Sequence, residues 1–480
     1  MKNKLFKVLT VFLVLLLVVG CGQKGKDGGK DDEVVTLLMY QVGEEPDNFD
    51  KIMERVNEIA EEEIGARVDF KYIGWGDWGQ KMPIIISSGE YYDMALAVNY
   101  TSNAQKGAFV ALDDLIKEYA ADYFAELDDA YITGNLVDGK LYGFPVNGNV
   151  FAQQMFTFNY PVLEKYGLED QIEGVKTYAD LEPILEAVKE QDKEIAGFAV
   201  GQGYKATLGN FDYVIGGMPF AVDIDGDHNK IVNAYETPQA MERLKEVHGL
   251  YKKGLIPQDA ATSQTSYGHG EDTWVVRMET QGPQDFGDKL LTTVAQRKLV
   301  SVPVSKPIKS TAQAQMANFV ISSNSKHPEK AFQFLTLMNT NAEVLNTMIH
   351  GVKGEDWEMD GTDRVKKLTP GNHMSPWNTA NNNLVYQEAD VTDEMIAERD
   401  KAMAEAVASP ILGFTFVEDD VKTEIANVKN VLSQYEDGLN TGTLDPEETL
   451  PKFIEELNTA GMQKVLEEMQ SQFDTWKAAQ

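Results

Sequence analysis

The opening of the folded part of the chain alternates between strand-like and helix-like runs of apolar positions. Residues 34–40 are almost continuously apolar, which indicates a buried strand, and apolar residues recur at helical spacing over residues 49–63. Residues 67–73 alternate as a second strand does, residues 78–87 favour a helix, and residues 92–98 favour a third strand. This order predicts an α/β layer built on a mostly parallel sheet.

Turn and capping signals mark further elements along the chain. Asp138-Gly139 indicates a hairpin turn between two short strands, and a strand over residues 156–160 leads into a short helix that ends at Gly167. Thr177 is expected to cap a helix that runs to about residue 189. A later helix begins near Pro328 and has one apolar stripe, formed by Ala331, Phe332, Leu335 and Met338.

The N-terminus has the pattern of an export signal. Three lysines precede an apolar run over residues 8–19, which is too short to span a bilayer stably. Residues 18–21, Val-Val-Gly-Cys, resemble the bacterial lipobox, in which the cysteine is lipidated and becomes the mature N-terminus. We therefore predict that residues 1–20 are a signal peptide, that Cys21 carries a lipid anchor and that residues 21–32 are a flexible tether. The alternative is an ordinary signal peptide followed by an incidental cysteine.

Composition narrows the range of partners. The chain has a formal net charge of −33, and loss of residues 1–20, which contain three lysines and no acidic residue, would change it to −36. Such an acidic surface repels phosphate polymers and anionic lipid headgroups, which argues against nucleic-acid binding and against peripheral docking on membranes. Cys21 is the only cysteine, so no disulfide can form within the chain.

Three motifs in the body of the chain occur in a recognisable order. Residues 138–145 read Asp-Gly-Lys-Leu-Tyr-Gly-Phe-Pro, residues 158–168 combine a strand and a helix with a terminal Gly-Leu, and residues 325–335 begin Ser-Lys-His-Pro-Glu. Together they resemble extracellular solute-binding proteins of the maltodextrin-binding type, components of ABC sugar importers. A narrower resemblance, to a lipoprotein subgroup with a DUF3502-type C-terminal region, is carried by residues 351–357, 410–414 and 460–476.

This resemblance implies an α/β, periplasmic-binding-protein-like fold of two lobes, with a ligand cleft between them and a hinge of crossing strands. By analogy, residues 33–146 and 312–345 form the first lobe, and residues 147–311 and 346–480 form the second. It also implies that the chain captures a carbohydrate, either an oligosaccharide or a modified sugar. The chain would deliver that sugar to ABC permease subunits at the outer face of the cell membrane. We expect a monomer that needs no cofactor.

Candidate ligand-binding residues follow from the chemistry of sugars. Sugars present apolar CH faces and many hydroxyl groups, so their sites combine aromatic rings with short polar side chains. In open α/β sheets such side chains gather in the loops at the carboxyl ends of strands. Strand ends and polar, aromatic segments near the crossovers point to Tyr40, Glu44, Trp75, Trp78, Tyr100, Asn147, Trp274, Arg277, Gln281, Trp377 and Asn378. For each tryptophan, a place in the core is the alternative interpretation.

Two further motifs are interpreted as turns. Residues 74–79 fit Gly-x-Gly-x-x-Gly, but the segment has no basic residue for a pyrophosphate, and Asp77 would face it. Residues 223–229 resemble the start of a calcium loop. However, His228 stands where glycine belongs and Ala234 where a bidentate glutamate belongs, so a polar hairpin turn is favoured over a metal site.

Support for catalysis is weak. The six histidines are scattered, neither His-Glu-x-x-His nor Gly-x-Ser-x-Gly occurs, and carboxylate pairs are too common in so acidic a chain to mark a glycosidase. We therefore predict a binding protein and not an enzyme. Three alternatives stay open, namely a secreted polysaccharide-acting enzyme, a surface adhesin for glycans and a binding protein for a peptide or another small solute.

Overall fold

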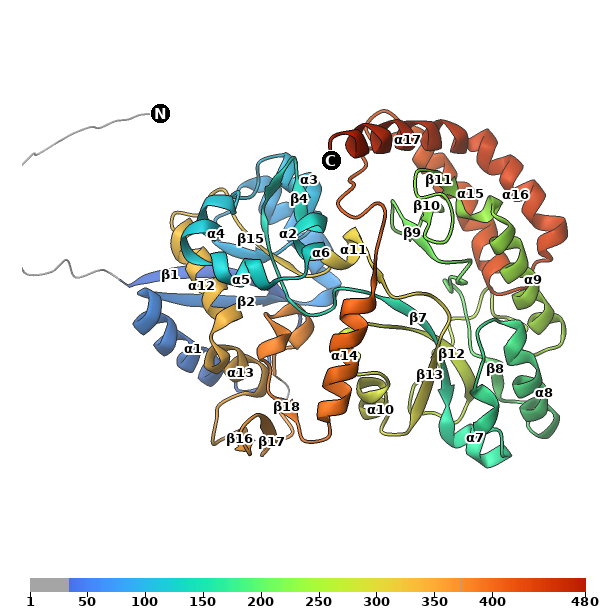
Figure 1. Ribbon diagram of the computed structural model, residues 1–480, viewed down its shortest axis with the longest axis horizontal. Helices are drawn as coiled ribbons and strands as arrows, with labels where there is room; N and C mark the ends of the chain where they lie inside the picture. The colour runs from blue at the N-terminus through green and yellow to red at the C-terminus, as the bar shows by residue number, and fades with distance from the viewer. Residues whose placement is uncertain (1–33, 372) are drawn as a thin grey trace, which may run out of the picture.

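The computed structural model describes residues 34–371 and 373–480, which form two lobes side by side (Figure 1). The predicted signal peptide, Cys21 and the tether lie outside the described residues. The first lobe contains a five-stranded sheet in the order β2-β1-β3-β15-β6. Its strands are β1 (Val35–Val42), β2 (Ala66–Ile73), β3 (Met94–Leu96), β15 (Asn318–Ile321) and β6 (Gly143–Pro145).

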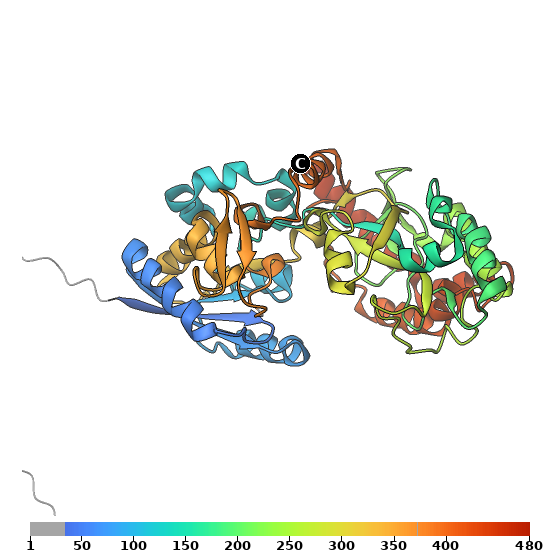
Figure 2. The same ribbon diagram turned by 90° about the horizontal axis from the view of Figure 1, so that it is seen from below.

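The strand directions in this sheet bring several loops to one edge. β1 pairs in parallel with β2 and with β3, whereas β15 runs antiparallel to β3 and to β6. The carboxyl ends of β1, β2 and β3 therefore share an edge of the sheet. In Figures 1 and 2 the arrowheads of β1 and β2 point toward the second lobe, so this edge faces it.

Helices complete the core of the first lobe. α1 (Phe49–Ile64) buries Ile52 and Val56, one helical turn apart, in the same apolar cluster as α12 (Pro328–Thr340) and α13 (Ala342–His350). The apolar stripe predicted for α12 is confirmed, because its four members are fully buried. The other helices named on this lobe are α2 (Trp75–Ser88), α3 (Tyr100–Gln105), α4 (Asp113–Tyr119), α5 (Ala121–Glu126) and α6 (Asp129–Asn135).

The second lobe is built on a four-stranded sheet, β13-β7-β12-β8, and a three-stranded sheet, β11-β10-β9. The strands are β7 (Gln153–Asn159), β8 (Ala196–Phe198), β9 (Phe211–Tyr213), β10 (Phe220–Asp223), β11 (Ile231–Asn233), β12 (Trp274–Gln281) and β13 (Leu299–Pro303). Its helices include α7 (Tyr160–Tyr166), α8 (Glu182–Gln191), α9 (Pro238–Lys252) and α10 (Lys289–Ala295). The predicted two-lobed α/β fold is confirmed.

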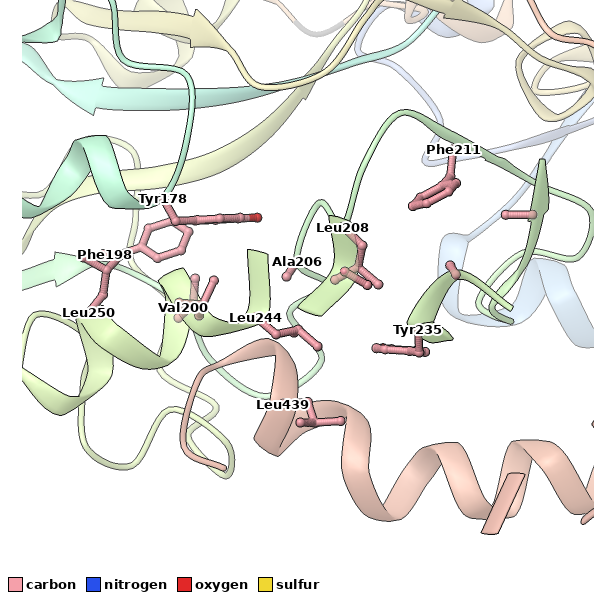
Figure 3. Packing of buried hydrophobic residues seen from close by; sticks show 14 of the residues in the cluster. Tyr178, Phe198, Val200, Ala206, Leu208, Phe211, Tyr235, Leu244, Leu250 and Leu439 are labelled. Carbon is pink, nitrogen blue, oxygen red and sulfur yellow. The ribbon is translucent and has the colours of Figure 1, made fainter. Parts of the chain in front are cut away.

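The last three helices belong to the core of the second lobe. α15 (Lys422–Asn440), α16 (Pro446–Ala460) and α17 (Met462–Ala478) bury Val428, Phe453 and Met469 in the same apolar cluster as α8 and α9. Figure 3 shows part of this cluster, with Leu439 of α15 below Leu244 of α9. Removal of these helices would expose the cluster to water, so they are an integral part of the lobe.

Three segments cross between the lobes. The first joins β6 to β7, the second contains β14 (Ile308–Lys309) and α11 (Thr311–Ala314), and the third passes through α14 (Asp393–Glu405) and β19 (Val407–Ala408). Ala152 forms a β-bridge with Ile308, and β14 pairs in parallel with β19, so the three crossings lie side by side. Lys309 Nζ lies 2.6 Å from Asp128 Oδ2 at the start of α6, which ties the second crossing to the first lobe.

The crossing expected around Asn346 occurs later in the chain. Asn346 is buried inside α13, and its Nδ2 donates to Leu384 O at 2.8 Å. α13 stays in the first lobe because its apolar face completes the cluster around α1, and Met374 and Ala380 join the same cluster. The segment expected to begin the second lobe therefore packs on the first. It includes a small sheet of β16 (Trp357–Asp360), β17 (Arg364–Lys367) and β18 (Gln387–Glu388).

Local signals predicted some element boundaries better than others. The hairpin of β4 (Leu136–Val137) and β5 (Lys140–Leu141) is confirmed, and Asp138 and Gly139 both have the positive φ values, 50° and 75°, that a two-residue turn requires. The helix predicted to start near Thr177 begins only at Glu182, after a 3₁₀ turn over residues 179–181. The reason is local, because Asp180 Oδ2 accepts the backbone N–H of Thr177 at 2.9 Å and holds a turn there.

Candidate functional site

A cavity of about 1340 Å³ lies between the lobes, beside the crossing segments. α3, which follows β3, lines it from the first lobe, and residues 205–219, which follow β8, line it from the second. Side chains of the second crossing and of residues 411–419 complete its walls. Small-molecule sites usually measure about 300–1000 Å³. This cavity therefore has room for a ligand of several sugar units.

The wall from the second lobe combines aromatic rings with short polar groups. Tyr213 is 39% exposed and Tyr235 lines the cavity deeper in the lobe, where its hydroxyl accepts from Asn440 Nδ2 at 3.1 Å. Asn440 Oδ1 in turn accepts the backbone N–H of Ala206 at 3.1 Å. These contacts fix the amide and the ring in place, so the wall is ordered without help from a ligand. Aromatic faces next to hydrogen-bonding groups suit a polyhydroxylated guest.

Tyr100 is the one predicted site residue that lines this cavity. The side chain is buried, and its hydroxyl donates to Asn135 O at 2.7 Å and accepts from Tyr142 N at 3.1 Å. Burial raises the pKa of Tyr100 to about 12. Because both contacts are internal to the first lobe, Tyr100 positions α3 at the cavity wall.

A second group of predicted residues gathers at the edge formed by the ends of β1 and β2. Trp75 is 58% exposed, and its ring stacks on Trp377 with centroids 6.0 Å apart and an interplanar angle of 24°. Glu44 is exposed, and its side chain lies next to Gly74, the residue before Trp75. A Cβ added to Gly74 would lie 2.9 Å from Glu44 Oε1. Residues at least 31 positions apart in the chain thus form one partly exposed aromatic and acidic surface, outside the cavity wall but on the edge that faces the second lobe.

Four predicted residues of the first lobe and the first crossing act mainly in packing. Tyr40 makes an edge contact with Tyr92 at 6.3 Å, and Trp78 packs half-buried against two apolar clusters. The buried Asn147 accepts the backbone N–H of Asn382 at its carbonyl, 2.8 Å away. Asn378 is also buried, and its carbonyl accepts from the Gln41 side chain. Trp78 lies on the same helix as Trp75, and Asn378 directly follows Trp377 in a 3₁₀ turn, so packing at these two positions helps to hold the ring pair.

Trp274, Arg277 and Gln281 share β12 but make contacts within the second lobe. Trp274 is 0% exposed and its Nε1 donates to Gly268 O at 2.8 Å, so it offers no ring to a ligand and the structure corrects that prediction. The Arg277 guanidinium lies 5.7 Å from the Trp274 ring, and its Nε pairs with Glu279 Oε1 at 2.5 Å. Gln281 Nε2 donates to Asp288 Oδ1 at 2.8 Å.

Sequence reasoning missed the cavity-lining residues after β8. Residues 201–217 contain five glycines and the exposed Tyr213, and they follow a strand of the second sheet. The strand-end rule would have selected them, but β8 has only three residues, Ala196–Phe198, and no periodic pattern. Other lining residues, among them Phe416 and Asn440, reach the cavity through the packing of the C-terminal helices.

The two motifs interpreted as turns have clear structures. α2 begins at Trp75, so Gly76 and Gly79 lie within a helix and do not form a loop around a phosphate. Residues 224–230 connect the antiparallel strands β10 and β11, which confirms the hairpin turn. Within that turn the Asp225 carboxylate pairs with Lys306. Among the described residues, no group of three or more His, Cys, Asp or Glu side chains is placed to hold a metal ion.

Asp212 on β9 is a buried carboxyl group in the cavity wall. Burial raises its pKa to about 6 from an ordinary value of 3.8, and hydrogen bonds from Ser409 and the Tyr213 amide oppose the shift. Burial favours the protonated carboxyl group, so the contribution of Asp212 to the free energy of unfolding is fully present below pH 3.8. That contribution is lost as the pH rises through about 6. We expect Asp212→Asn to raise the free energy of unfolding at neutral pH by about 2–3 kcal/mol, with little effect near the ordinary pKa of aspartate.

Urea unfolding of the wild type and the Asp212→Asn variant over a series of pH values checks this expectation. His350, whose pKa burial lowers to about 4, titrates in an overlapping range in both proteins. Its contribution cancels when the difference between the two unfolding free energies is plotted against pH. Equal stability of the two proteins at neutral pH would contradict the expectation.

Comparison with known proteins identifies the family. The family described as "Bacterial extracellular solute-binding protein" matches residues 54–353, and the family described as "Domain of unknown function (DUF3502)" matches residues 410–478. This chain belongs to the bacterial extracellular solute-binding proteins. The resemblance inferred from sequence motifs, including the C-terminal region, is therefore confirmed.

Individual relatives match over nearly the whole chain. A "Carbohydrate ABC transporter substrate-binding protein" of Streptococcus pneumoniae serotype 4 is 45% identical over 464 residues, which cover 95% of this chain and 93% of the relative. A crystal structure of the N-glycan transport solute binding protein (NgtS) from Streptococcus pneumoniae has 45% identity and a TM-score of 0.88, and the match covers 92% of this chain and 98% of that one. The TM-score is 0.78 to NgtS in complex with Man1GlcNAc, with 92% and 99% covered, and 0.74 to its complex with Man5GlcNAc, with 92% and 98% covered.

These matches identify the general function of the chain. The chain is the extracellular solute-binding component of an ABC importer, as predicted, and its relatives are substrate-binding proteins and not enzymes. It is extracellular and membrane-associated. Within residues 34–371 and 373–480, no helix is both long and apolar enough to cross a membrane.

Proposed function

We propose that this chain binds oligosaccharides of the N-glycan type, built from mannose and N-acetylglucosamine, and presents them to the importer's permease subunits. The observation that carries the proposal is a cavity of about 1340 Å³ lined from both lobes, in a chain 45% identical to NgtS. NgtS is described in complex with Man1GlcNAc and with Man5GlcNAc. A cavity larger than an ordinary small-molecule site suits the larger of these two ligands.

Closure of the two lobes around the sugar is the mechanism that the geometry favours. The lobes have separate apolar cores and are joined by three adjacent crossing segments, an arrangement that allows hinge motion with little repacking. All three NgtS structures have 45% sequence identity to this chain, but their TM-scores to it range from 0.88 down to 0.74. The relative therefore adopts more than one conformation, which supports a hinge in this chain too.

Recognition of the sugar divides between two surfaces in this proposal. The cavity wall supplies Tyr213, and the edge of the first sheet supplies Trp75, backed by Trp377. Glu44 lies beside that ring pair and would accept hydrogen bonds from sugar hydroxyl groups. The acidic charge of the whole chain, −33, disfavours polyanionic ligands and leaves neutral glycans as the better match.

Isothermal titration calorimetry of the purified protein tests the ligand class. Man5GlcNAc and Man1GlcNAc are titrated in parallel with a linear glucose oligomer of similar length, which offers hydroxyl groups in a different arrangement. We expect saturable binding with one site for the mannose-containing ligands and much weaker binding of the glucose oligomer. Binding of the glucose oligomer alone, or of no sugar, would contradict the proposal.

Lipid anchorage at Cys21 is a separate part of the proposal. The support is the lipobox-like sequence before Cys21, the only cysteine in the chain. Metabolic labelling with a fatty acid analogue should mark the wild type and leave Cys21→Ser unlabelled, with the variant released into the medium. Labelling of the variant would contradict the anchor. We also propose that the protein acts as a monomer, which light scattering of the purified protein checks.

A further inference from the structure

The C-terminal region, which matches a domain of unknown function over residues 410–478, forms a wall of the interlobe cavity. Phe414, Phe416, Val417 and Asp419 line the cavity from the segment that precedes α15, and Glu436 lines it from α15 itself. In Figure 1 this segment rises from the third crossing between the lobes toward the C-terminal helices. The region is thus placed against the ligand space as well as against the core of the second lobe.

The wall segment is held rigidly from behind by α17. Val417 N donates to Gln472 Oε1 at 2.9 Å, and Gln472 Nε2 donates back to Val417 O at 3.0 Å. Phe414 packs against Phe473 and Trp476, with ring centroids 5.4 and 5.7 Å away. A segment fixed by both backbone and ring contacts is ordered before a ligand arrives, which lowers the entropic cost of binding.

The side chains at the front of this segment combine apolar surface with charge. Val417 is 43% exposed and Phe416 is half-buried, although both lie in a cavity wall. Exposed apolar groups inside a cavity suit the CH faces of a sugar. From the first lobe, Gln105 of α3 and Lys106, which follows α3, line the same cavity. A hydrogen bond from Lys422 lowers the pKa of Asp419, and the positive charge of Lys106 contributes to the same shift.

We propose that residues 414–419 are a specificity-determining wall for the oligosaccharide, so that the C-terminal region takes part directly in ligand recognition. This inference rests on the proposed function, because it assigns part of the same site. A ligand that fills the cavity touches α3 of one lobe and this wall of the other. The wall therefore adds contacts that a short ligand, confined to one part of the cavity, does not use.

Calorimetry with Man5GlcNAc and Man1GlcNAc on the full protein tests the wall. We expect Phe416→Ala and Val417→Ala each to weaken binding of Man5GlcNAc by about tenfold, because each removes apolar contact area, and to weaken Man1GlcNAc less. Leu368→Ala is the matched control, since Leu368 is also 43% exposed but does not line the cavity. The control should bind both ligands as the wild type does.

The outcomes separate this inference from the proposed function. If the wild type binds Man5GlcNAc and both wall variants bind it within about twofold of the wild type, the wall plays no part in recognition and the inference is overturned. If the wild type binds neither sugar, the proposed function fails first. Hydrogen exchange gives a measurement that needs no variant, because saturating Man5GlcNAc should slow exchange at residues 414–419. Unchanged exchange there would also overturn the inference.

Discussion

Replacing Trp75 with alanine is expected to weaken binding of Man5GlcNAc by about 30-fold, or about 2 kcal/mol, and to leave thermal stability almost unchanged. Trp75 is 58% exposed, so truncation removes little buried surface from the folded protein. Its ring is nevertheless held in place by stacking on Trp377 at 6.0 Å. A large ring that is exposed and already oriented offers stacking area to a sugar at low entropic cost.

Calorimetry and thermal melting of paired variants check this expectation. Ile84→Ala is the matched control, because Ile84 lies on the same helix and is 64% exposed. Trp75→Phe should keep part of the affinity, since it retains an aromatic face. If Trp75→Ala binds Man5GlcNAc as tightly as the wild type does, the ring pair lies outside the binding surface. That result would contradict the proposal that the cavity wall and the Trp75 surface both recognise the sugar.

Trp274→Ala should have the opposite profile, a loss of about 3–5 kcal/mol in the free energy of unfolding with ligand affinity retained in the folded fraction. The Trp274 side chain is 0% exposed and packs in a cluster with Ala196, Ala295 and Leu299. Truncation would leave a cavity there. It would also leave Gly268 O without the indole N–H that lies 2.8 Å away.

Urea unfolding measures the stability of Trp274→Ala, and calorimetry below its transition measures its affinity. Trp274→Phe fills most of the space and should recover part of the lost stability without restoring the hydrogen bond to Gly268. A stable Trp274→Ala variant that no longer binds Man5GlcNAc would contradict the packing role and would support Trp274 as a ligand contact.

The contrast between these two tryptophans shows what local sequence can predict about the site. Trp75 was selected because it follows a predicted strand, and Trp274 because it lies in a polar, aromatic segment before a predicted crossover. Their burial depends on partners far along the chain, because Trp75 stacks on Trp377 whereas Trp274 packs with residues 295 and 299. A single sequence carries no signal for these pairings, so exposure could not be assigned before the structure was known.

The same division between local and distant contacts holds for the fold. α1, α12 and the hairpin at Asp138-Gly139 were predictable, because periodicity and turn chemistry act over a few residues. The third crossing was not, since it depends on the pairing of β14 with β19, about 100 residues apart. The cavity wall at residues 414–419 was missed for a similar reason, because α17 holds it in place from the end of the chain.

A crystal structure of this protein with Man5GlcNAc tests most directly whether the two lobes hold an oligosaccharide between them. We expect the sugar in the interlobe cavity, in contact with α3 and the Trp75 ring of the first lobe and with residues 205–219 and 414–419 of the second. The lobes should be closer together than in the structure described above. A sugar bound on the outer surface of one lobe, with the cavity open and empty, would contradict the proposed mechanism.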